Sequence, residues 1–373
     1  MGTDKFKSLV QSILAPAGIT VNGNDPWDIR IKDERFYRRA ITEGSLGLGE
    51  SYVDGWWECE RLDEFFFRII PLDPEAEIRK DIGLLLRFLP ALVLNKGGRA
   101  RAFQIGEKHY DRGNRLFRHM LDRRMVYSCA YWKDAKDLDE AQEAKLDLIC
   151  RKLSLRPGQR VMDIGCGWGG LAKYAAEKYG VSATGITVSR EQAELGKLRC
   201  EKLPVEIRLQ DYREVDEEFD HIASVGMFEH VGYKNYRTYL QAVHRCLKDE
   251  GLFLLHTIGS NRSQIAGDPW IDKYIFPNSL VPSMKQISAS LEGLFVVEDW
   301  HNFGPYYDPT LLAWFRNFDA HWDELRELYS DRFYRMWKYY LLSCSGSFRC
   351  RHMQVWQFVL SKRGVPGGYR PVR

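Results

Sequence analysis

Short apolar runs alternate with amphipathic stretches from Arg156 onward, and this alternation constrains the fold most. The expected strands are residues 159–167, 181–189, 205–211, 219–231, 251–259 and 294–304, and the expected helices are residues 168–180, 190–202, 235–248 and 282–292. Apolar runs of this length between amphipathic helices are typical of strands that are buried on both faces. The sequence therefore predicts an α/β fold with a parallel sheet, whose ligands bind beyond the carboxyl ends of the strands.

The part of the chain that precedes this pattern is expected to be a smaller, mainly helical domain. A length of 373 residues, with 45% hydrophobic and 28% charged residues, fits a globular protein of about two domains. The Gly- and Arg-rich stretch "LNKGGRAR" is the best linker candidate, which gives expected domains at residues 1–98 and 99–373.

Two absences in the sequence lead us to expect a cytoplasmic protein. The amino-terminal residues lack the pattern of a signal peptide, and the longest apolar stretch, residues 82–94, contains Arg87 and Pro90 and is too short to span a bilayer. The eight cysteines are scattered without a CxxC pair, which argues against a zinc site or a disulfide framework.

A glycine-rich turn follows the first expected strand and opens a helix, which is the context of a nucleotide-binding loop. The turn differs from the dinucleotide pattern GxGxxG, and no phosphate-binding lysine follows it. Its glycines allow close approach of a ligand, and its acid suits a cationic or hydroxyl-bearing ligand better than a pyrophosphate. The candidate residues are Asp163, Gly165, Cys166, Gly167, Trp168 and Gly169.

Polar residues also stand at the ends of the later strands. The second and third strands end near Thr187, Ser189, Gln192, Gln210, Asp211 and Tyr212. Glu229 and His256 stand near the ends of the fourth and fifth strands, and Tyr307 follows the sixth. A lone histidine in a strand is usually a core residue, but the carboxyl ends of parallel strands meet at one edge, so we expect these side chains to share one crevice. One histidine and one carboxylate are too few ligands for a metal, and no metal site is predicted.

Two further segments leave alternatives open. The sequence "YSCAYW", residues 127–132, is equally compatible with a core strand and with a functional segment. The basic stretch at residues 95–124 is typical of a solvated helix face, and also of a surface that binds the phosphates of nucleic acid or of anionic lipid.

Taken in order, these motifs resemble those of the cyclopropane synthases, a family of class I S-adenosylmethionine-dependent methyltransferases that acts on phospholipids or on mycolic acids. The similar segments are "GEKHYDRGNRLF", "YSCAYW", "DIGCGWGG", "QDYR", "GMFEHVG", "LLHTIG" and "HNFG". Residues 43–59 resemble the amino-terminal region of the phospholipid branch. The resemblance covers essentially the whole chain and implies a Rossmann-like methyltransferase sheet.

The resemblance implies roles for individual residues. S-Adenosylmethionine would be held by Tyr127, Ser128 and the candidate residues between Asp163 and Tyr212 named above. A bicarbonate ion would be held by Cys129, Glu229, His256, Tyr307 and the backbone of Ile258. Cys344 matches a cysteine that has been treated as an active-site residue in this family; because direct methyl transfer requires no covalent enzyme intermediate, we expect it to line the pocket instead.

The resemblance also implies the substrate and the partners. We expect a peripheral enzyme that binds anionic membranes reversibly, acts on the unsaturated acyl chains of phospholipids, forms a homodimer and has no nucleic-acid partner. Rings at helical spacing between Trp314 and Tyr340 would line an acyl tunnel or form core. Two alternatives remain open: a small-molecule N-methyltransferase on the same scaffold, and a lipid-binding protein without catalysis.

Overall fold

The computed structural model of the protein describes residues 3–73 and 113–373, which belong to two compact units. The described residues of the first unit are 3–73, Ala266–Phe276 and Leu311–Met353. Those of the second are 113–265, Pro277–Thr310 and Gln354–Arg373. The expected boundary between residues 98 and 99 lies outside the described residues and stays a prediction. Each unit is described by itself below.

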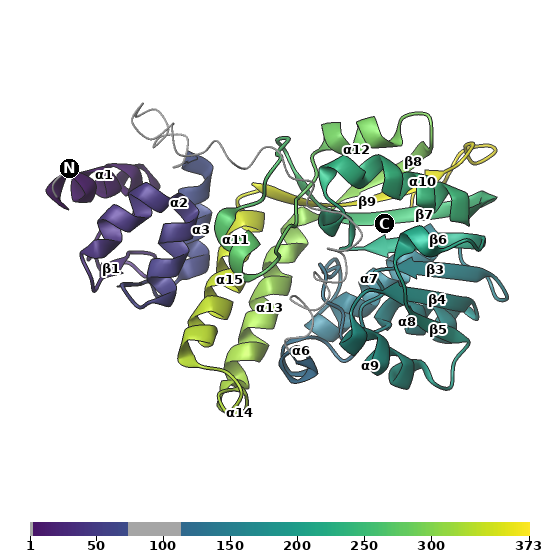
Figure 1. Cartoon of the computed structure of the whole chain (residues 1–373), viewed down its shortest axis with the longest axis horizontal. Helices are drawn as coiled ribbons and strands as arrows, with labels where there is room; N and C mark the ends of the chain where they lie inside the picture. Colours follow the sequence, from purple (N-terminus) through teal and green to yellow (C-terminus); the bar gives the residue numbers. More distant parts are fainter. Residues whose placement is uncertain (1–2, 74–112) are drawn as a thin grey trace. The chain divides into compact units, whose positions relative to one another are not determined.

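A seven-stranded sheet forms the centre of the second unit, with the strand order β5-β4-β3-β6-β7-β9-β8 (Figure 1). The strands are β3 (Arg160–Ile164), β4 (Ser182–Thr187), β5 (Val205–Leu209), β6 (Phe219–Val225), β7 (Leu247–Ser260), β8 (Val296–Asn302) and β9 (Met353–Ser361). From β5 to β7 each pair of neighbours is parallel, which confirms the expected α/β class. The carboxyl ends of these strands therefore meet at one edge of the sheet.

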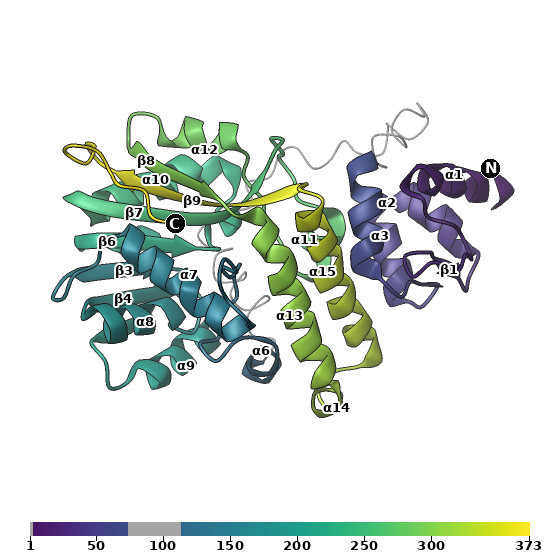
Figure 2. The ribbon, with the colours of Figure 1, turned by 180° about the vertical axis from the view of Figure 1, so that it is seen from behind.

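Helices cover both faces of this sheet (Figure 2). The helices of the unit are α6 (Asn114–Met120), α7 (Leu138–Lys152), α8 (Gly170–Tyr179), α9 (Arg190–Cys200), α10 (Tyr236–Cys246) and α12 (Met284–Leu291). Apolar residues of α7 and α8 pack on one face, and those of α10 and α12 pack on the other. The strands are thus buried on both sides, as their apolar composition predicts.

The far edge of the sheet differs from the prediction. The expected strand at residues 294–304 forms as β8, but β9 lies between β7 and β8 and pairs antiparallel with β8. The alternation of expected strands and helices ends at residue 304 and predicts no strand at residues 353–361. The strand that precedes Tyr307 is consequently not the neighbour of the strand that carries His256.

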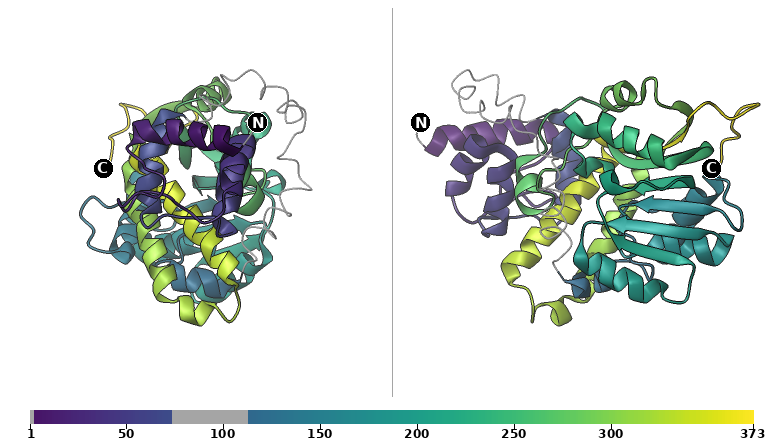
Figure 3. Two further views of the ribbon diagram at one scale, coloured as in Figure 1. Left: turned by 90° about the vertical axis from the view of Figure 1, so that its left-hand side faces the viewer. Right: turned by 45° about the vertical axis from the view of Figure 1, so that its right-hand side comes forward.

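The first unit is mainly helical, as expected for its amino-terminal part (Figure 3). Its elements are α1 (Thr3–Leu14), α2 (Arg35–Val53), α3 (Leu62–Ile69), α11 (Pro269–Tyr274), α14 (Trp322–Leu325), α15 (Asp331–Arg349) and the short strands β1 (Arg30–Ile31) and β2 (Trp57–Glu58). Helix α13 spans Tyr307–Ala320. None of the helices within residues 3–73 and 113–373 is long and apolar enough to cross a membrane.

Candidate active site

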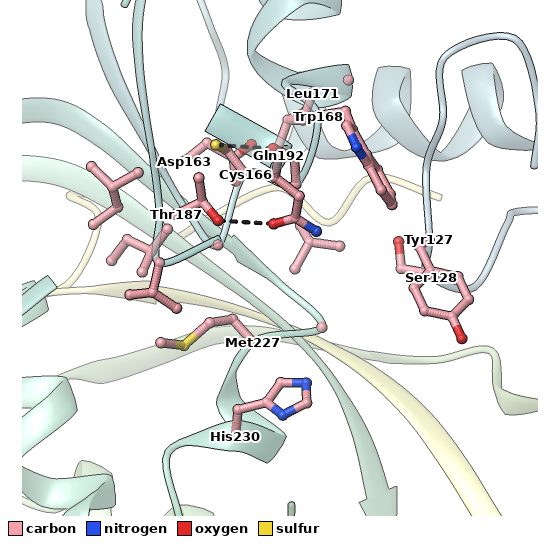
Figure 4. A pocket seen from close by; sticks show the side chains of 18 of the residues that line it. Tyr127, Ser128, Asp163, Cys166, Trp168, Leu171, Thr187, Gln192, Met227 and His230 are labelled. Atoms are coloured by element: carbon pink, nitrogen blue, oxygen red, sulfur yellow. Dashed lines mark hydrogen bonds between the residues drawn. The ribbon is translucent and has the colours of Figure 1, made fainter. Parts of the chain in front are cut away.

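A pocket opens where the chain leaves the carboxyl ends of β3, β4, β5 and β6 (Figure 4). Of the residues expected to bind the cofactor, all except Gly169 and Ser189 line this pocket. Residues that were not predicted also line it, among them Met125, Lys145 and His230. Most of the residues predicted to bind the cofactor therefore line one pocket, and their contact with the cofactor stays a prediction. Glu229, His256 and Tyr307, which were expected in the same crevice, do not line this pocket.

The glycine-rich turn brings the backbone against the pocket. Gly165 has φ +79°, and a Cβ built on it would lie 2.8 Å from Cβ of Met227, so a larger residue would be strained and would also collide with Met227. Gly169 has φ +79° as well, but it is the N-cap residue of α8, where a Cβ would lie 3.1 Å from Sγ of Cys200. We therefore assign Gly169 to the packing of α8 rather than to ligand contact.

The turn after β4 is held by hydrogen bonds between side chains. Ser189 is the N-cap of α9, and its Oγ accepts a hydrogen bond from the backbone N–H of Gln192 at 3.3 Å. Thr187 Oγ1 donates to Gln192 Oε1 at 2.8 Å, which orients the amide beside the pocket (Figure 4). Ser189 thus supports the turn that carries Gln192 and does not itself line the pocket.

After β5, Gln210, Asp211 and Tyr212 all line the pocket. The carboxylate of Asp211 caps the following turn by accepting from the backbone N–H of Arg213 at 2.9 Å, and it forms an ion pair with the guanidinium of Arg213 at 2.8 Å. The predicted contact of Asp211 with the cofactor therefore stays a prediction, since this carboxylate already has a structural partner.

Residues 127–132 form no strand, so the hypothesis of a core strand is wrong. This segment is an irregular stretch that is held by the buried face of α7. Gln142 Nε2 donates to the backbone oxygens of Val126 and Ser128 at 3.2 and 2.8 Å, and Lys145 Nζ donates to Ser128 Oγ at 2.8 Å. Two polar side chains one helical turn apart thereby fix Tyr127 and Ser128 at the pocket wall.

Lys145 is the functional candidate that the sequence analysis missed. It is completely buried, and burial lowers the pKa of its ammonium to about 8. A signal was present in the sequence: Lys145 stands among Ala141, Leu148 and Ile149 on the apolar face of a helix, where an unpaired lysine is costly.

Asp163 is buried at the end of β3, and burial raises the pKa of its carboxyl to about 7, although the charge of Lys145 opposes this shift. A carboxylate in such a place gains more from a cationic ligand than an exposed one would, because water screens it poorly. The geometry and the charge of this end of the pocket favour a ligand that carries a positive group.

Glu229 and His256 form a second polar group at the same edge of the sheet. Glu229 Oε1 accepts from the backbone N–H of Ile258 at 2.6 Å, which places this carboxyl beside β7 two residues beyond His256. Its Oε2 is buried and has no hydrogen-bond partner among residues 3–73 and 113–373. Burial raises the pKa of Glu229 to about 7, and burial together with nearby cations holds the pKa of His256 well below its usual range.

The other residues expected around a bicarbonate ion are also buried in this unit. Cys129 is fully buried, and burial raises the pKa of its thiol. The charge of Lys145 acts on the pKa of both Cys129 and His256, so these groups lie within electrostatic reach of one another. Tyr307 is buried at the start of α13. The structure thus buries each of these residues within the second unit, while their arrangement around an ion stays a prediction.

Cys344 belongs to α15 in the first unit and is not among the residues that line the pocket. Burial and nearby Asp268 raise the pKa of its thiol to about 12, so the thiolate is scarce at neutral pH. A scarce thiolate argues against a nucleophilic role, which stays a prediction. The expectation that Cys344 lines the pocket is not met by the pocket described above.

Part of the basic stretch at residues 95–124 is described, and it includes internal ion pairs. Arg124 pairs with Glu143 at 2.7 Å and with Glu177 at 3.0 Å, and Arg123 pairs with Glu143 at 2.9 Å. These two arginines therefore stabilise the second unit. The apolar residues 82–94 and the basic residues before Gly113 lie outside the described residues.

Comparison with known proteins gives one consistent result. The family model "Mycolic acid cyclopropane synthetase" matches residues 98–358. Over 370 residues the chain is 54% identical to a cyclopropane-fatty-acyl-phospholipid synthase of Escherichia coli, which covers 99% of this chain and 97% of the relative.

Two solved structures resemble the chain. One is the cyclopropane synthase MmaA2 of Mycobacterium tuberculosis, with a TM-score of 0.67 and 30% identity over 70% of this chain and 98% of that one. The other is the mycolic acid cyclopropane synthase CmaA1 in complex with SAH and CTAB, with a TM-score of 0.66, 33% identity and the same two coverages.

Proposed function

Since the chain belongs to the mycolic acid cyclopropane synthetase family, we propose that it transfers a methylene unit from S-adenosylmethionine to the cis double bond of an unsaturated phospholipid acyl chain. The products are a cyclopropane fatty acyl phospholipid and S-adenosylhomocysteine. The observation that carries this proposal is the identity to the E. coli phospholipid enzyme over nearly the whole of both chains.

The pocket fits the methyl donor in its charge. S-Adenosylmethionine has a cationic sulfonium and an ammonium group, and Asp163 offers a buried carboxyl whose ionised form such a cation would stabilise. Tyr127 and Ser128 stand at the opposite wall, where α7 holds them (Figure 4). In the proposed complex these walls hold the methionine part of the donor, and Thr187 to Tyr212 hold the nucleoside.

The reaction sets two requirements for the site. An isolated double bond is a weak nucleophile, so its π electrons must attack the electrophilic methyl carbon as the carbon–sulfur bond breaks. Attack leaves a carbocation on the acyl chain, and loss of a proton from the new methyl group closes the ring. The site must therefore exclude water and place a base within proton-transfer reach.

We propose bicarbonate as that base, held by Cys129, Glu229, His256, Tyr307 and the backbone of Ile258. Bound bicarbonate would supply an acceptor for the methyl proton. The unpartnered Oε2 of Glu229 supports the proposal, because a buried oxygen without a partner is costly unless a ligand bonds to it. The neutral ring of His256 can donate a hydrogen bond without carrying a proton that would neutralise the base.

The function is tested by incubating the full chain with S-adenosylmethionine and vesicles of unsaturated anionic phospholipid, followed by mass spectrometry of the acyl chains. We expect acyl chains heavier by one methylene unit, together with S-adenosylhomocysteine, and no such product from saturated vesicles. Turnover that methylates a small amine would instead indicate an N-methyltransferase, and donor binding without turnover would indicate a lipid-binding protein.

The base is tested by removing dissolved bicarbonate from the same assay and adding it back. We expect activity to fall on depletion and to return with added bicarbonate, while the affinity for S-adenosylmethionine stays constant. Full activity in depleted buffer would show that another group accepts the proton.

We further propose that the protein binds anionic membranes reversibly and acts there as a homodimer. Lysine and arginine near an anionic surface contribute about 1 kcal/mol each, and two copies of a modest anchor would bind with greater avidity than one. The basic residues Arg99 and Arg101 carry this hypothesis, because Arg123 and Arg124 are already paired within the protein.

The membrane proposal predicts that binding to anionic vesicles weakens with salt and falls when Arg99 and Arg101 are both replaced by glutamate. Reversing the charges of Lys178 and Lys197, two exposed lysines of α8 and α9, is the matched control and should change binding less. Binding that is insensitive to salt would contradict the proposal, and a monomer by sedimentation would contradict its dimeric part.

A further inference from the structure

Gln357 is a buried amide that lies beside the ring of His256. Gln357 is on β9 and His256 is on β7, the neighbouring strand, and neither side chain is more than 2% exposed. The amide nitrogen Nε2 of Gln357 lies 3.2 Å from Nδ1 of the imidazole. On the same strand, Trp356 and Phe358 pack in the core on one face, and Val359 packs on the face covered by α7 and α8. A polar amide in such surroundings is costly unless it forms a hydrogen bond.

The chemistry of this contact selects one form of the histidine. An amide NH₂ group can only donate a hydrogen bond, so Nδ1 of His256 must accept it and cannot carry a proton. A neutral imidazole has a single N–H, which then has to be at Nε2. The contact between Gln357 and His256 is thus compatible with the Nε2–H tautomer and not with the Nδ1–H tautomer.

The opposite orientation of the amide would be less favourable. In the structure, the carbonyl oxygen Oε1 of Gln357 has no hydrogen-bond partner among the described residues, whereas Nε2 contacts His256. Exchanging oxygen and nitrogen would leave the NH₂ donor buried and unbonded instead. Buried donors without partners are rarer in proteins than carbonyl oxygens with unused lone pairs.

The surroundings of His256 keep its ring neutral, so that the choice of tautomer matters. The positively charged or ionisable groups that act on it are Lys145 and Lys152 of α7 and His301 of β8. Lys152 Nζ lies 3.2 Å from Nδ1 of His301, so this lysine stands close to one of the groups that act on His256. Added positive charge on His256 would be repelled by these groups.

We propose that Gln357 is a positioning residue that holds His256 as the Nε2–H tautomer, so that the ring presents a hydrogen-bond donor to an anion in the site. The opposite tautomer would present a lone pair at Nε2 and would repel an oxyanion. The consequence for catalysis rests on the proposed function, in which the anion is the base. The tautomer itself does not, because it is a property of the protein without substrate.

The tautomer is measured directly by ¹⁵N NMR of the full chain labelled at its histidines. Substituting His256→Gln identifies the resonances of His256 among those of the nine histidines. In the wild-type protein we expect His256 to show a protonated Nε2 and an unprotonated Nδ1. The reverse assignment would overturn the proposal, whether or not the protein makes cyclopropane rings.

Gln357→Glu is the decisive variant, because a carboxylate can accept a hydrogen bond from the ring but cannot donate one. We expect protonation of Nδ1 of His256 and a fall in kcat of about 10–100-fold, as is typical for partners that orient a functional histidine. The KM for S-adenosylmethionine should stay unchanged. An unchanged histidine spectrum would overturn the proposal.

Gln357→Met is the second variant, for the case that Gln357→Glu does not fold. It removes the hydrogen-bond donor with little change in volume and should yield a mixture of His256 tautomers. A pure Nε2–H form in this variant would also overturn the proposal.

Gln354→Glu is the matched control, since it makes the same change on the same strand. Oε1 of Gln354 accepts from Nδ2 of Asn302 at 3.2 Å, and a carboxylate would keep this bond. We expect the spectrum of His256 to stay as in the wild-type protein. If the tautomer changes equally in both variants, the effect comes from added charge on β9 and the proposal is wrong. If Gln357→Glu alone changes the tautomer but no ring product forms in the wild type, the inference holds and the proposed function fails.

Discussion

The two ends of the proposed site handle buried charge in different ways: the cofactor end is the pocket that Asp163 lines, and the other end is the group of Glu229 and His256, which do not line that pocket. At the cofactor end, Asp163 is buried near Lys145, an acid and a base whose charges oppose the effect of burial on each other. At the other end, burial moves both Glu229 and His256 toward their neutral forms. The first end favours a cationic ligand, and the second offers hydrogen bonds to an anion without a fixed positive charge of its own. In the proposed reaction a cationic methyl donor and an anionic base are bound in one site, and this difference between the two ends suits each of them.

The largest expected effect is at the cofactor end. Asp163→Asn should weaken S-adenosylmethionine binding by about 2–5 kcal/mol, because it removes the buried partner of the donor's positive charge. Isothermal titration calorimetry measures this loss directly. Retained affinity would show that Asp163 does not contact the cationic part of the donor.

The same variant should weaken donor binding but remove a loss of folding stability at higher pH. The folded pKa of Asp163, about 7, lies above its ordinary value of 3.8, so between these values the folded protein binds more protons than the unfolded chain. Wild-type stability should therefore fall as the pH rises from about 4 to 7, and Asp163→Asn should lack this loss. Melting temperatures at pH 5 and pH 8 provide the test, and an equal pH dependence in both proteins would contradict it.

The next effect is expected at the other end of the site, on turnover instead of on donor binding. Glu229→Gln should lower kcat by about 10²–10³-fold, as is typical for removal of one positioned electrostatic group, while leaving S-adenosylmethionine binding nearly intact. Steady-state kinetics and calorimetry on the same preparation separate the two quantities. A large loss of donor affinity would mean that the two ends do not act independently.

A smaller effect is expected for Lys145→Met, which keeps the length of the side chain but removes its bond to Ser128. Loss of a hydrogen bond from a charged group costs about 1.5–3 kcal/mol, and part of this should appear as weaker donor binding, because the segment at Tyr127 and Ser128 loses a support. Lys173→Met on α8 is the control, since its ammonium bonds the backbone oxygen of Arg199 instead. Equal effects of the two variants on donor affinity would refute a specific role.

The smallest effect is expected outside both ends. Cys344→Ser should retain most of the activity, because its thiol is protonated at neutral pH and the proposed chemistry needs no nucleophile. The measurement is the vesicle assay at saturating donor. Complete loss of activity in a folded Cys344→Ser protein would indicate a direct chemical role for this cysteine.

The cofactor end could be predicted from the sequence because its signals are local. Asp163 and Thr187 lie at the carboxyl ends of apolar strands, Gly165 directly follows one, and the topology of a parallel sheet brings such positions to one edge. Lys145 and Gln142 were missed, since their role depends on which face of α7 is buried and on what lies against that face. Ser189 was predicted to contact the cofactor but caps α9 and does not line the pocket; polar residues of this type serve both as helix caps and as ligand contacts, so the sequence does not distinguish the two roles.

By itself, the sequence determined the α/β class, the parallel orientation of the strands from β5 to β7 and the glycine turn, because each of these follows from periodicity or from backbone conformations that few residues adopt. Only the tertiary structure decided that β9 lies between β7 and β8 and that Gln357 meets His256. The physical reason is the range of the interaction: these two residues are about one hundred positions apart in the chain, and no local pattern specifies which buried polar groups will pair.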